Sequence, residues 1–210
     1  MTYDVYVFDL DGTLTDPVEG ITKSYQYAAA AFGIKTELAD LRHFIGPPIR
    51  ECFKELGFTD DNVEQGVEKF REYLSTTGLY QNAVYPDLPA TLARLKAEGK
   101  VLALATNKIT PFAQRILEHF NLAQYFSTVS GDEPDGSLSK DGKAEIIRIA
   151  LAGIGAKKAV MLGDRKHDIS GANAVGIDSI GVLWGYGSRE ELTEAGATHI
   201  IECADEIFAI

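Results

Sequence analysis

The most informative stretch of the chain lies near its start and reads Val5-Tyr6-Val7-Phe8-Asp9-Leu10-Asp11-Gly12-Thr13. Its apolar first part, rich in valine and aromatic residues, predicts a buried strand. The abrupt change to Asp-x-Asp-Gly-Thr predicts a loop at the carboxyl edge of a sheet, where ligands bind in open α/β folds. Two carboxylates about 4 Å apart repel each other by roughly 4 kcal/mol at an effective dielectric constant near 20. We therefore expect a divalent cation or a reaction to use them, and hard oxygen ligands suit Mg²⁺.

The same stretch has a plainer interpretation, in which a strand is followed by an Asp-Gly turn with Asp11 and Thr13 at the surface. Asp-Gly turns are common in proteins. A chance match to D-x-D-G-T in 210 residues has odds of about one in a thousand. Polar clusters at the ends of later strands favour the chemical interpretation.

Composition and charge narrow the class of function. The chain has 210 residues, of which 45% are hydrophobic and 24% charged, as is typical of a globular protein with a sizeable core. Its formal net charge of −11 argues against binding a nucleic-acid polymer and against docking on an anionic membrane. The charge fits an enzyme that handles a small anionic substrate locally, through a metal and a lysine.

Cysteine usage and the first residues suggest a cellular location. Cys52 and Cys203 fit no metal-ligand spacing, and their apolar surroundings predict buried free thiols. The start, Met1-Thr2-Tyr3-Asp4, has no basic segment, and no long apolar span follows. We expect a cytoplasmic protein, either a monomer or a homodimer.

The region after the first strand predicts an all-helical domain. Helical patterns cover residues 18–32, 38–44, 48–56 and 60–76, with Gly33 and Gly57 as end signals and no strand pattern between them. Residues 16–82 are therefore a predicted helical cap domain, inserted into a core formed by residues 1–15 and 83–210.

Helices and strands alternate in the rest of the chain. Strands are predicted at 100–105, 125–131, 159–162, 179–183 and 198–201, and helices at 88–98, 111–120, 143–153, 169–175, 189–195 and 205–210. A polar loop is predicted over 132–142. Alternation of this kind predicts an α/β fold, a Rossmann-like parallel sheet with helices on both faces.

Polar residues follow three of the predicted strands. Asp9 and Asp11 follow the first, Thr106 and Asn107 the second, and the stretch Gly163-Asp164-Arg165-Lys166-His167-Asp168 another. A parallel sheet brings these carboxyl ends to one edge. The sequence thus predicts one site assembled from distant segments.

Four of these segments resemble, in order and spacing, the haloacid dehalogenase-like phosphohydrolases. They are Asp9-Leu10-Asp11-Gly12-Thr13, Thr106-Asn107-Lys108, Lys143 and residues 163–168, and the helical insert resembles the family's mobile cap. Within the family the chain looks most like phosphoglycolate phosphatases and a related group of 5′-nucleotidases. Phe44-Ile45-Gly46-Pro47-Pro48 and Gly163-Asp164-Arg165 suggest this subgroup.

The resemblance implies a role for each residue. Asp9 would attack phosphorus to form an aspartyl-phosphate, and Asp11 would protonate the leaving alcohol and then activate water. Thr106 and Asn107 would donate hydrogen bonds to the phosphoryl oxygens. Lys143 would place positive charge on the phosphoryl group and the nucleophile.

The resemblance also implies Mg²⁺ bound by Asp9, the backbone carbonyl of Asp11, Asp164 and Asp168. Asp168 has two further interpretations, because it can support the other ligands from outside or cap the first turn of its helix. Thr106 and Asn107 can cap the following helix instead of binding phosphate. Lys140 competes with Lys143 for the lysine role.

The predicted cap would set specificity. Arg50 and Lys23 are candidate partners for an anionic substrate group, although an exposed arginine on a helix is equally ordinary. A small basic pocket would suit phosphoglycolate, whereas an aromatic pocket would suit a nucleotide base. Tyr25, Phe44 and Phe53 are available for such a pocket, or they form the core of the cap.

The sequence therefore predicts a Mg²⁺-dependent phosphatase for a small phosphomonoester of the phosphoglycolate type, with 5′-nucleotidase activity as the alternative. A non-catalytic phospho-acceptor module is a remote alternative, because receiver domains also use acidic residues, a threonine and a lysine on a parallel sheet. Such domains carry the acceptor on a middle strand and lack a helical insert after the first strand.

Overall fold

The computed structural model describes residues 3–140, 142–155 and 158–210. Met1 and Thr2, the first residues of the start that has no basic segment, lie outside the described residues, as does one position of the predicted loop over 132–142. The chain divides into two compact units. Unit 1 comprises Met1–Asp16 and Val84–Ile210, and unit 2 comprises Pro17–Ala83.

A six-stranded parallel sheet forms the centre of unit 1, with the strand order β5-β4-β1-β6-β7-β8. The strands are β1 (Val5–Phe8), β4 (Val101–Ile109), β5 (Thr128–Asp132), β6 (Ala159–Gly163), β7 (Asp178–Val182) and β8 (His199–Ile201). All four residues of β1 are buried, as expected of a central parallel strand covered on both faces. The predicted α/β fold is confirmed.

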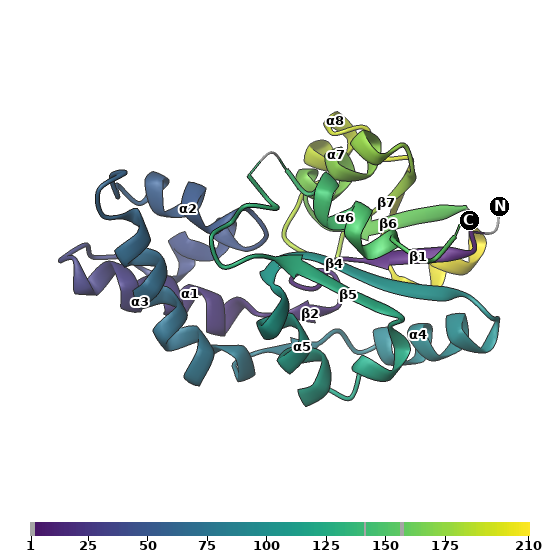
Figure 1. The fold of residues 1–210 in the computed structure, drawn as a ribbon, viewed down its shortest axis with the longest axis horizontal. Coiled ribbons are helices and arrows are strands. Elements are labelled where there is room, and N and C mark those ends of the chain that lie inside the picture. Colours follow the sequence, from purple (N-terminus) through teal and green to yellow (C-terminus); the bar gives the residue numbers. More distant parts are fainter. Residues whose placement is uncertain (1–2, 141, 156–157) are drawn as a thin grey trace. The chain divides into compact units, whose positions relative to one another are not determined.

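Helices cover both faces of this sheet (Figure 1). On one face lie α6 (Ala144–Leu151), α7 (Lys166–Val175) and α8 (Arg189–Glu194), and on the other α4 (Leu88–Ala97) and α5 (Thr110–His119). Val5, Val7 and Met161 pack on Ile146 and Ile147 of α6 in one buried cluster. Short 3₁₀ helices, η3 (Ala123–Tyr125) and η4 (Ala204–Ala209), complete unit 1.

Strand β4 differs from its prediction in a way that affects the site. The strand runs on past residue 105 to Ile109, so the polar tripeptide at 106–108 belongs to it. The pairing of β4 with β5 shifts register between Thr106, opposite Gly131, and Ile109, opposite Asp132. Two residues of β4 thus bulge out of the ladder, which re-aims their side chains.

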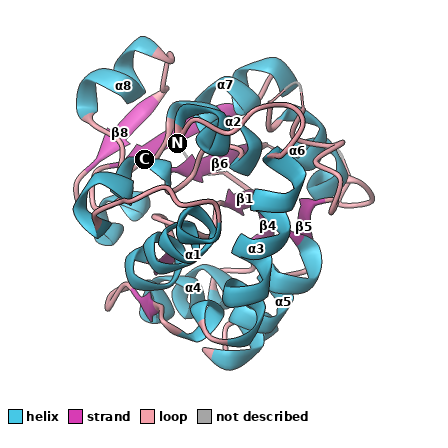
Figure 2. Ribbon diagram, turned by 90° about the vertical axis from the view of Figure 1, so that its left-hand side faces the viewer, coloured by secondary structure: helices cyan, strands magenta, loops and turns pink. Residues whose placement is uncertain are grey.

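Unit 2 is built almost entirely of helices (Figure 2). They are α1 (Val18–Ala31), η1 (Leu38–Phe44), α2 (Ile49–Glu55), α3 (Val63–Thr76) and η2 (Gly78–Tyr80). The Tyr25 ring lies 4.6–5.3 Å, centroid to centroid, from the rings of Phe44, Phe53 and Phe70, and all four side chains are buried. These aromatic residues form the core of the unit, which supports the second interpretation of Tyr25, Phe44 and Phe53.

Two further sequence interpretations need correction. The pattern does not anticipate β2 (Thr15–Asp16) and β3 (Ala83–Val84), which form a separate two-stranded sheet. Cys203 is exposed, not buried, because it begins the short C-terminal 3₁₀ helix, whereas Cys52 is a buried free thiol as expected. Among the described residues, no helix has the length and hydropathy needed to cross a membrane.

Candidate active site

Three of the predicted site residues of unit 1 lie at or just after the ends of adjacent strands of the sheet. Asp9 comes directly after β1, Thr106 lies near the end of β4, and Asp164 comes directly after β6. Because β1 pairs in parallel with both β4 and β6, their carboxyl ends lie side by side. All three side chains belong to buried residues.

Lys143 links two of the predicted carboxylates. It precedes α6, its side chain is only 1% exposed, and its Nζ lies 2.7 Å from Asp9 Oδ1 and also contacts Asp168 Oδ1. Burial lowers the pKa of Lys143, but the carboxylates of Asp168 and Asp9 outweigh burial and raise it above its usual value. Lys140, the competing lysine, is exposed.

Asp164 is held in place by groups whose contact with it the sequence did not predict. The Thr13 hydroxyl donates to its Oδ1 over 3.3 Å, and the backbone N–H of Tyr186 donates to its Oδ2 over 2.8 Å. A Cβ on Gly12 would lie 2.3 Å from Asp164 Oδ2, and one on Gly185 would lie 2.3 Å from Asp164 Cβ. The available sequence signal is the Asp-Gly-Thr motif, together with the glycines that alternate in 185–187.

Asp168 divides its oxygens between two partners. Its Oδ1 accepts from Lys143, and its Oδ2 accepts from the backbone N–H of Arg165 over 3.0 Å at the start of α7. The second bond is the helix-cap interaction that the sequence left open. The side chain therefore fixes both the lysine and the first turn of α7.

Asp9, Asp164 and Asp168 form a cluster that fits a divalent cation. One carboxylate oxygen from each lies within 4.8 Å of the others, and all three residues are buried. Burial raises the pKa of Asp9 to about 6, with Lys143 opposing and Asp168 adding to the rise. Burial, and then Asp168 and Asp9, raise the pKa of Asp164 well above its usual value. Buried oxygen donors that repel one another are the donor set that Mg²⁺ prefers.

Asp11 lies apart from this side-chain cluster and pairs with a residue that received no role from the sequence. Lys108 Nζ lies 2.8 Å from Asp11 Oδ2, and both side chains are close to fully buried. Asp11 Oδ1 is buried without a hydrogen-bond partner. Burial raises the pKa of Asp11, and Lys108 opposes that rise. A carboxyl with a raised pKa and one uncommitted oxygen is suited to proton transfer.

The two candidate phosphate-binding residues lie at the bulge of β4. Thr106 is 2% exposed, and its hydroxyl oxygen accepts from the backbone N–H of Lys108 over 3.3 Å. The Thr106 hydroxyl proton is thereby left for another acceptor. Asn107 belongs to the two-residue bulge itself.

The two cap candidates lie in unit 2, and each is engaged by a carboxylate. Lys23 pairs with Glu19 over 2.6 Å, and Arg50 forms a two-pronged contact with Glu64 at 2.6 and 2.8 Å. Both pairs lie within unit 2 and are partly exposed. An anionic substrate group would have to compete with these carboxylates, so their role in specificity stays a prediction.

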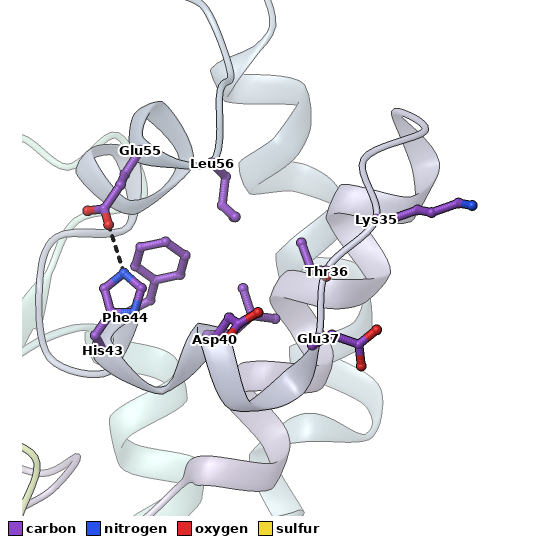
Figure 3. A pocket seen from close by; sticks show the side chains of 9 residues that line it. Lys35, Thr36, Glu37, Asp40, His43, Phe44, Glu55 and Leu56 are labelled. Atoms are coloured by element: carbon purple, nitrogen blue, oxygen red, sulfur yellow. Dashed lines mark hydrogen bonds and ion pairs between the residues drawn. The ribbon is translucent and has the colours of Figure 1, made fainter.

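Unit 2 also contains a pocket of about 340 Å³ (Figure 3). Glu37, Asp40 and Glu55 line it, with Lys35 as the one lysine, and His43 Nε2 lies 2.7 Å from Glu55 Oε1. Carboxylates outnumber cations in this lining. The pocket is therefore electrostatically unsuited to a phosphate ester.

Comparisons with known proteins place this geometry in context. The chain is 43% identical to a 5′-nucleotidase of Pseudomonas aeruginosa, over 98% of this chain and 93% of the relative. It is 36% identical to the tyrosine-protein kinase PtkA of Mycobacterium tuberculosis (94% and 68% covered), and 29% identical to a phosphoglycolate phosphatase of Aquifex aeolicus (87% and 85%).

Solved structures show the same fold. The crystal structure of a predicted phosphatase from Clostridium acetobutylicum matches with a TM-score of 0.94 and 41% identity, and covers 100% of this chain and 98% of that one. The family described as haloacid dehalogenase-like hydrolase matches residues 6–182, which include every candidate site residue of unit 1. The resemblance read from the motifs is confirmed, and the chain belongs to the haloacid dehalogenase-like hydrolases.

Proposed function

We propose that this hydrolase is a Mg²⁺-dependent phosphatase that cleaves small phosphomonoesters through an aspartyl-phosphate on Asp9. One observation carries the proposal: Asp9 is paired with the buried Lys143, while Asp11, two residues away, keeps one buried oxygen uncommitted. A nucleophile beside a cation and a proton-transfer group beside the nucleophile are the two requirements of this reaction.

In the first half of the reaction, an Asp9 carboxylate oxygen forms a bond to phosphorus, and the bond from phosphorus to the leaving oxygen breaks. The Asp11 carboxyl gives its proton to that leaving oxygen. The Thr106 hydroxyl and the Asn107 amide donate hydrogen bonds to the phosphoryl oxygens, and Lys143 balances their charge.

In the second half, the Asp11 carboxylate takes a proton from water, whose oxygen forms a bond to phosphorus. The bond between phosphorus and Asp9 then breaks, which releases inorganic phosphate and restores the Asp9 carboxylate. Asp11 thus acts first as an acid and then as a base.

The metal would be held by Asp9 and Asp164, whose oxygens belong to the buried cluster. When bound, Mg²⁺ supplies positive charge that offsets the charge of the carboxylates and of the phosphoryl group. Asp168 supports this arrangement by holding Lys143, since both of its oxygens already have partners.

Two substrates are candidates. Nucleoside 5′-monophosphates are supported by the 43% identity to the Pseudomonas 5′-nucleotidase, and phosphoglycolate by the 29% identity to the Aquifex phosphatase. Both are alkyl phosphate monoesters, so the chemistry of unit 1 serves either one, and residues of unit 2 such as Arg50 and Lys23 would discriminate between them.

The testing experiment is phosphate release from phosphoglycolate, AMP, other nucleoside monophosphates and sugar phosphates, with Mg²⁺ and with EDTA. We expect Mg²⁺-dependent release from one group, and we expect Asp9→Asn to abolish it. The matched control is Asp61→Asn, which changes an exposed aspartate of unit 2. Folded wild-type protein that binds phosphate but releases none from any ester would favour the phospho-acceptor alternative.

A further inference from the structure

We propose that Lys108 is a positioning residue for Asp11, and that it aims one oxygen of that carboxylate at the leaving group. This inference rests on the proposed phosphatase reaction and assigns a new residue to it. Lys108 acts through Asp11, and it is distinct from Lys143, which pairs with Asp9 and Asp168.

The contact between the two side chains is one-sided. Lys108 Nζ lies 2.8 Å from Asp11 Oδ2, with side-chain exposures of 7% and 11%. The other oxygen, Oδ1, is buried and has no hydrogen-bond partner. A buried polar atom left in this way costs free energy, so its retention points to a partner that arrives with the substrate.

The backbone of β4 aims the lysine at Asp11. Lys108 lies in the bulge between Thr106 and Ile109, where the register with β5 shifts. The backbone N–H of Lys108 donates to the Thr106 hydroxyl oxygen over 3.3 Å. On the neighbouring strand, a Cβ on Gly131 would lie only 2.2 Å from the Lys108 carbonyl oxygen, so only glycine leaves room for the bulge at this point.

Holding one oxygen determines the direction of the other. The terminal torsion of an aspartate is broad, so an unheld carboxylate turns readily about it. An ammonium at 2.8 Å from Oδ2 removes that freedom and fixes the plane of the carboxylate. Oδ1 is then presented in one orientation, which is what rapid proton transfer to a leaving oxygen requires.

The test compares leaving groups. An alkoxide must be protonated as it leaves, whereas p-nitrophenolate leaves without a proton. We expect Lys108→Met to slow phosphoryl transfer from phosphoglycolate or AMP by about 100-fold. With p-nitrophenyl phosphate the same step should slow by less than about 5-fold, because its leaving group needs no proton. Loss of general acid catalysis would cost far more than this. Single-turnover measurement with excess enzyme isolates this step from the later hydrolysis.

Further variants separate positioning from structural damage. Lys108→Arg should restore much of the alkyl ester rate, because the cation is retained. In an Asp11→Asn background, Lys108→Met should change the alkyl ester rate by less than about 2-fold, since coupled residues are not additive. Lys96→Met, at an exposed position of α4, is the matched control and should leave both rates unchanged.

Each remaining outcome contradicts the proposal. Equal losses on the two classes of ester, or no loss, would show that Lys108 does not act on the leaving group through Asp11. A further large loss in the Asp11→Asn background would show that Lys108 acts independently. Wild-type protein that cleaves no ester at all overturns the proposed phosphatase function itself, and this role with it.

Discussion

The Lys143 ammonium lies 2.7 Å from Asp9 Oδ1 and also contacts Asp168 Oδ1, although Asp9 follows β1 and Asp168 lies in the first turn of α7. With the side chain only 1% exposed, this cation is screened little by solvent. Adding Asp164 leaves three carboxylates against one lysine in the cluster. The imbalance leaves net negative charge where a divalent cation fits.

Removal of the buried lysine should affect both stability and turnover. Lys143→Met leaves Asp9 and Asp168 without their shared cation, and breaking a buried ion pair costs about 3–5 kcal/mol. Turnover should fall by at least about 100-fold, because a group that stabilises the transferring charge is lost. Urea unfolding and steady-state rates measure the two effects. Lys140→Met, at the exposed competitor, is the control, and similar losses in both variants would contradict the assignment of Lys143.

Metal binding should depend on Asp164. We expect Mg²⁺ at 100 times its dissociation constant to stabilise the wild-type protein by about 2.7 kcal/mol. Asp164→Asn should lose most of this gain, while its metal-free form should be more stable than the metal-free wild type. The reason is that burial and the carboxylates of Asp168 and Asp9 disfavour the charged form of Asp164 and raise its pKa. Thermal unfolding in EDTA and in Mg²⁺ tests both statements, with Asp61→Asn as control. An unchanged Mg²⁺ response in Asp164→Asn would remove this residue from the site.

The raised pKa of Asp9 predicts a pH dependence of stability without metal. The pKa is about 6 in the folded chain and 3.8 ordinarily, so the folded state binds more protons between these values. Stability therefore falls as pH rises from about 4 to about 6, by about 3 kcal/mol for this group. Asp9→Asn lacks this contribution. In EDTA, the free energy of unfolding of Asp9→Asn minus that of the wild type should therefore rise between pH 4 and pH 6. If this difference does not change with pH, the raised pKa of Asp9 is contradicted.

Glu191 should stabilise the acid-sensitive contact between α8 and the start of α7. Its Oε1 accepts from Arg165 Nε over 2.9 Å and from the backbone N–H of Lys166 over 2.8 Å. Burial raises the pKa of Glu191, but these two donors outweigh burial and lower it. The stability that Glu191 contributes is fully present above the ordinary pKa of a glutamate. It is lost as the pH falls through the lowered pKa of Glu191 in the folded chain. Glu191→Gln should cost about 1 kcal/mol at neutral pH, a modest figure because the pair is partly exposed. Urea unfolding at pH 7 and pH 3 tests this, and a loss in Glu191→Gln that is equal at the two pH values would contradict it.

Local sequence patterns were sufficient to predict the class of fold and the positions of some of the site residues. Alternating strand and helix signals predicted the parallel sheet, because periodicity in a sequence reports which face of each element is buried. The abrupt change from apolar to polar residues after Phe8 marked the strand end that carries Asp9 and Asp11. Parallel strands share one carboxyl edge, so those signals also predicted that Asp164 would lie close to Asp9.

Side-chain partners were beyond the reach of local patterns. Lys108 and Asp11 are far apart in sequence, and their ion pair depends on a bulge in β4 that Gly131 of the next strand permits. Nothing in the periodicity of residues 100–109 reports that bulge, since it arises from pairing between strands. The exposed position of Cys203 was missed for a related reason, because an apolar neighbourhood in sequence does not establish packing in space.

The sequence by itself determined the class of fold, the strand ends that carry the carboxylates and the motifs of a phosphohydrolase, because these depend on residue type and short spacing. Only the tertiary structure decided that Lys143 and not Lys140 meets Asp9, that Asp168 holds that lysine, and that Lys108 holds Asp11. The physical reason is that burial and pairing of charges depend on which side chains meet across the sheet edge. Such contacts are set by packing between elements far apart in the chain.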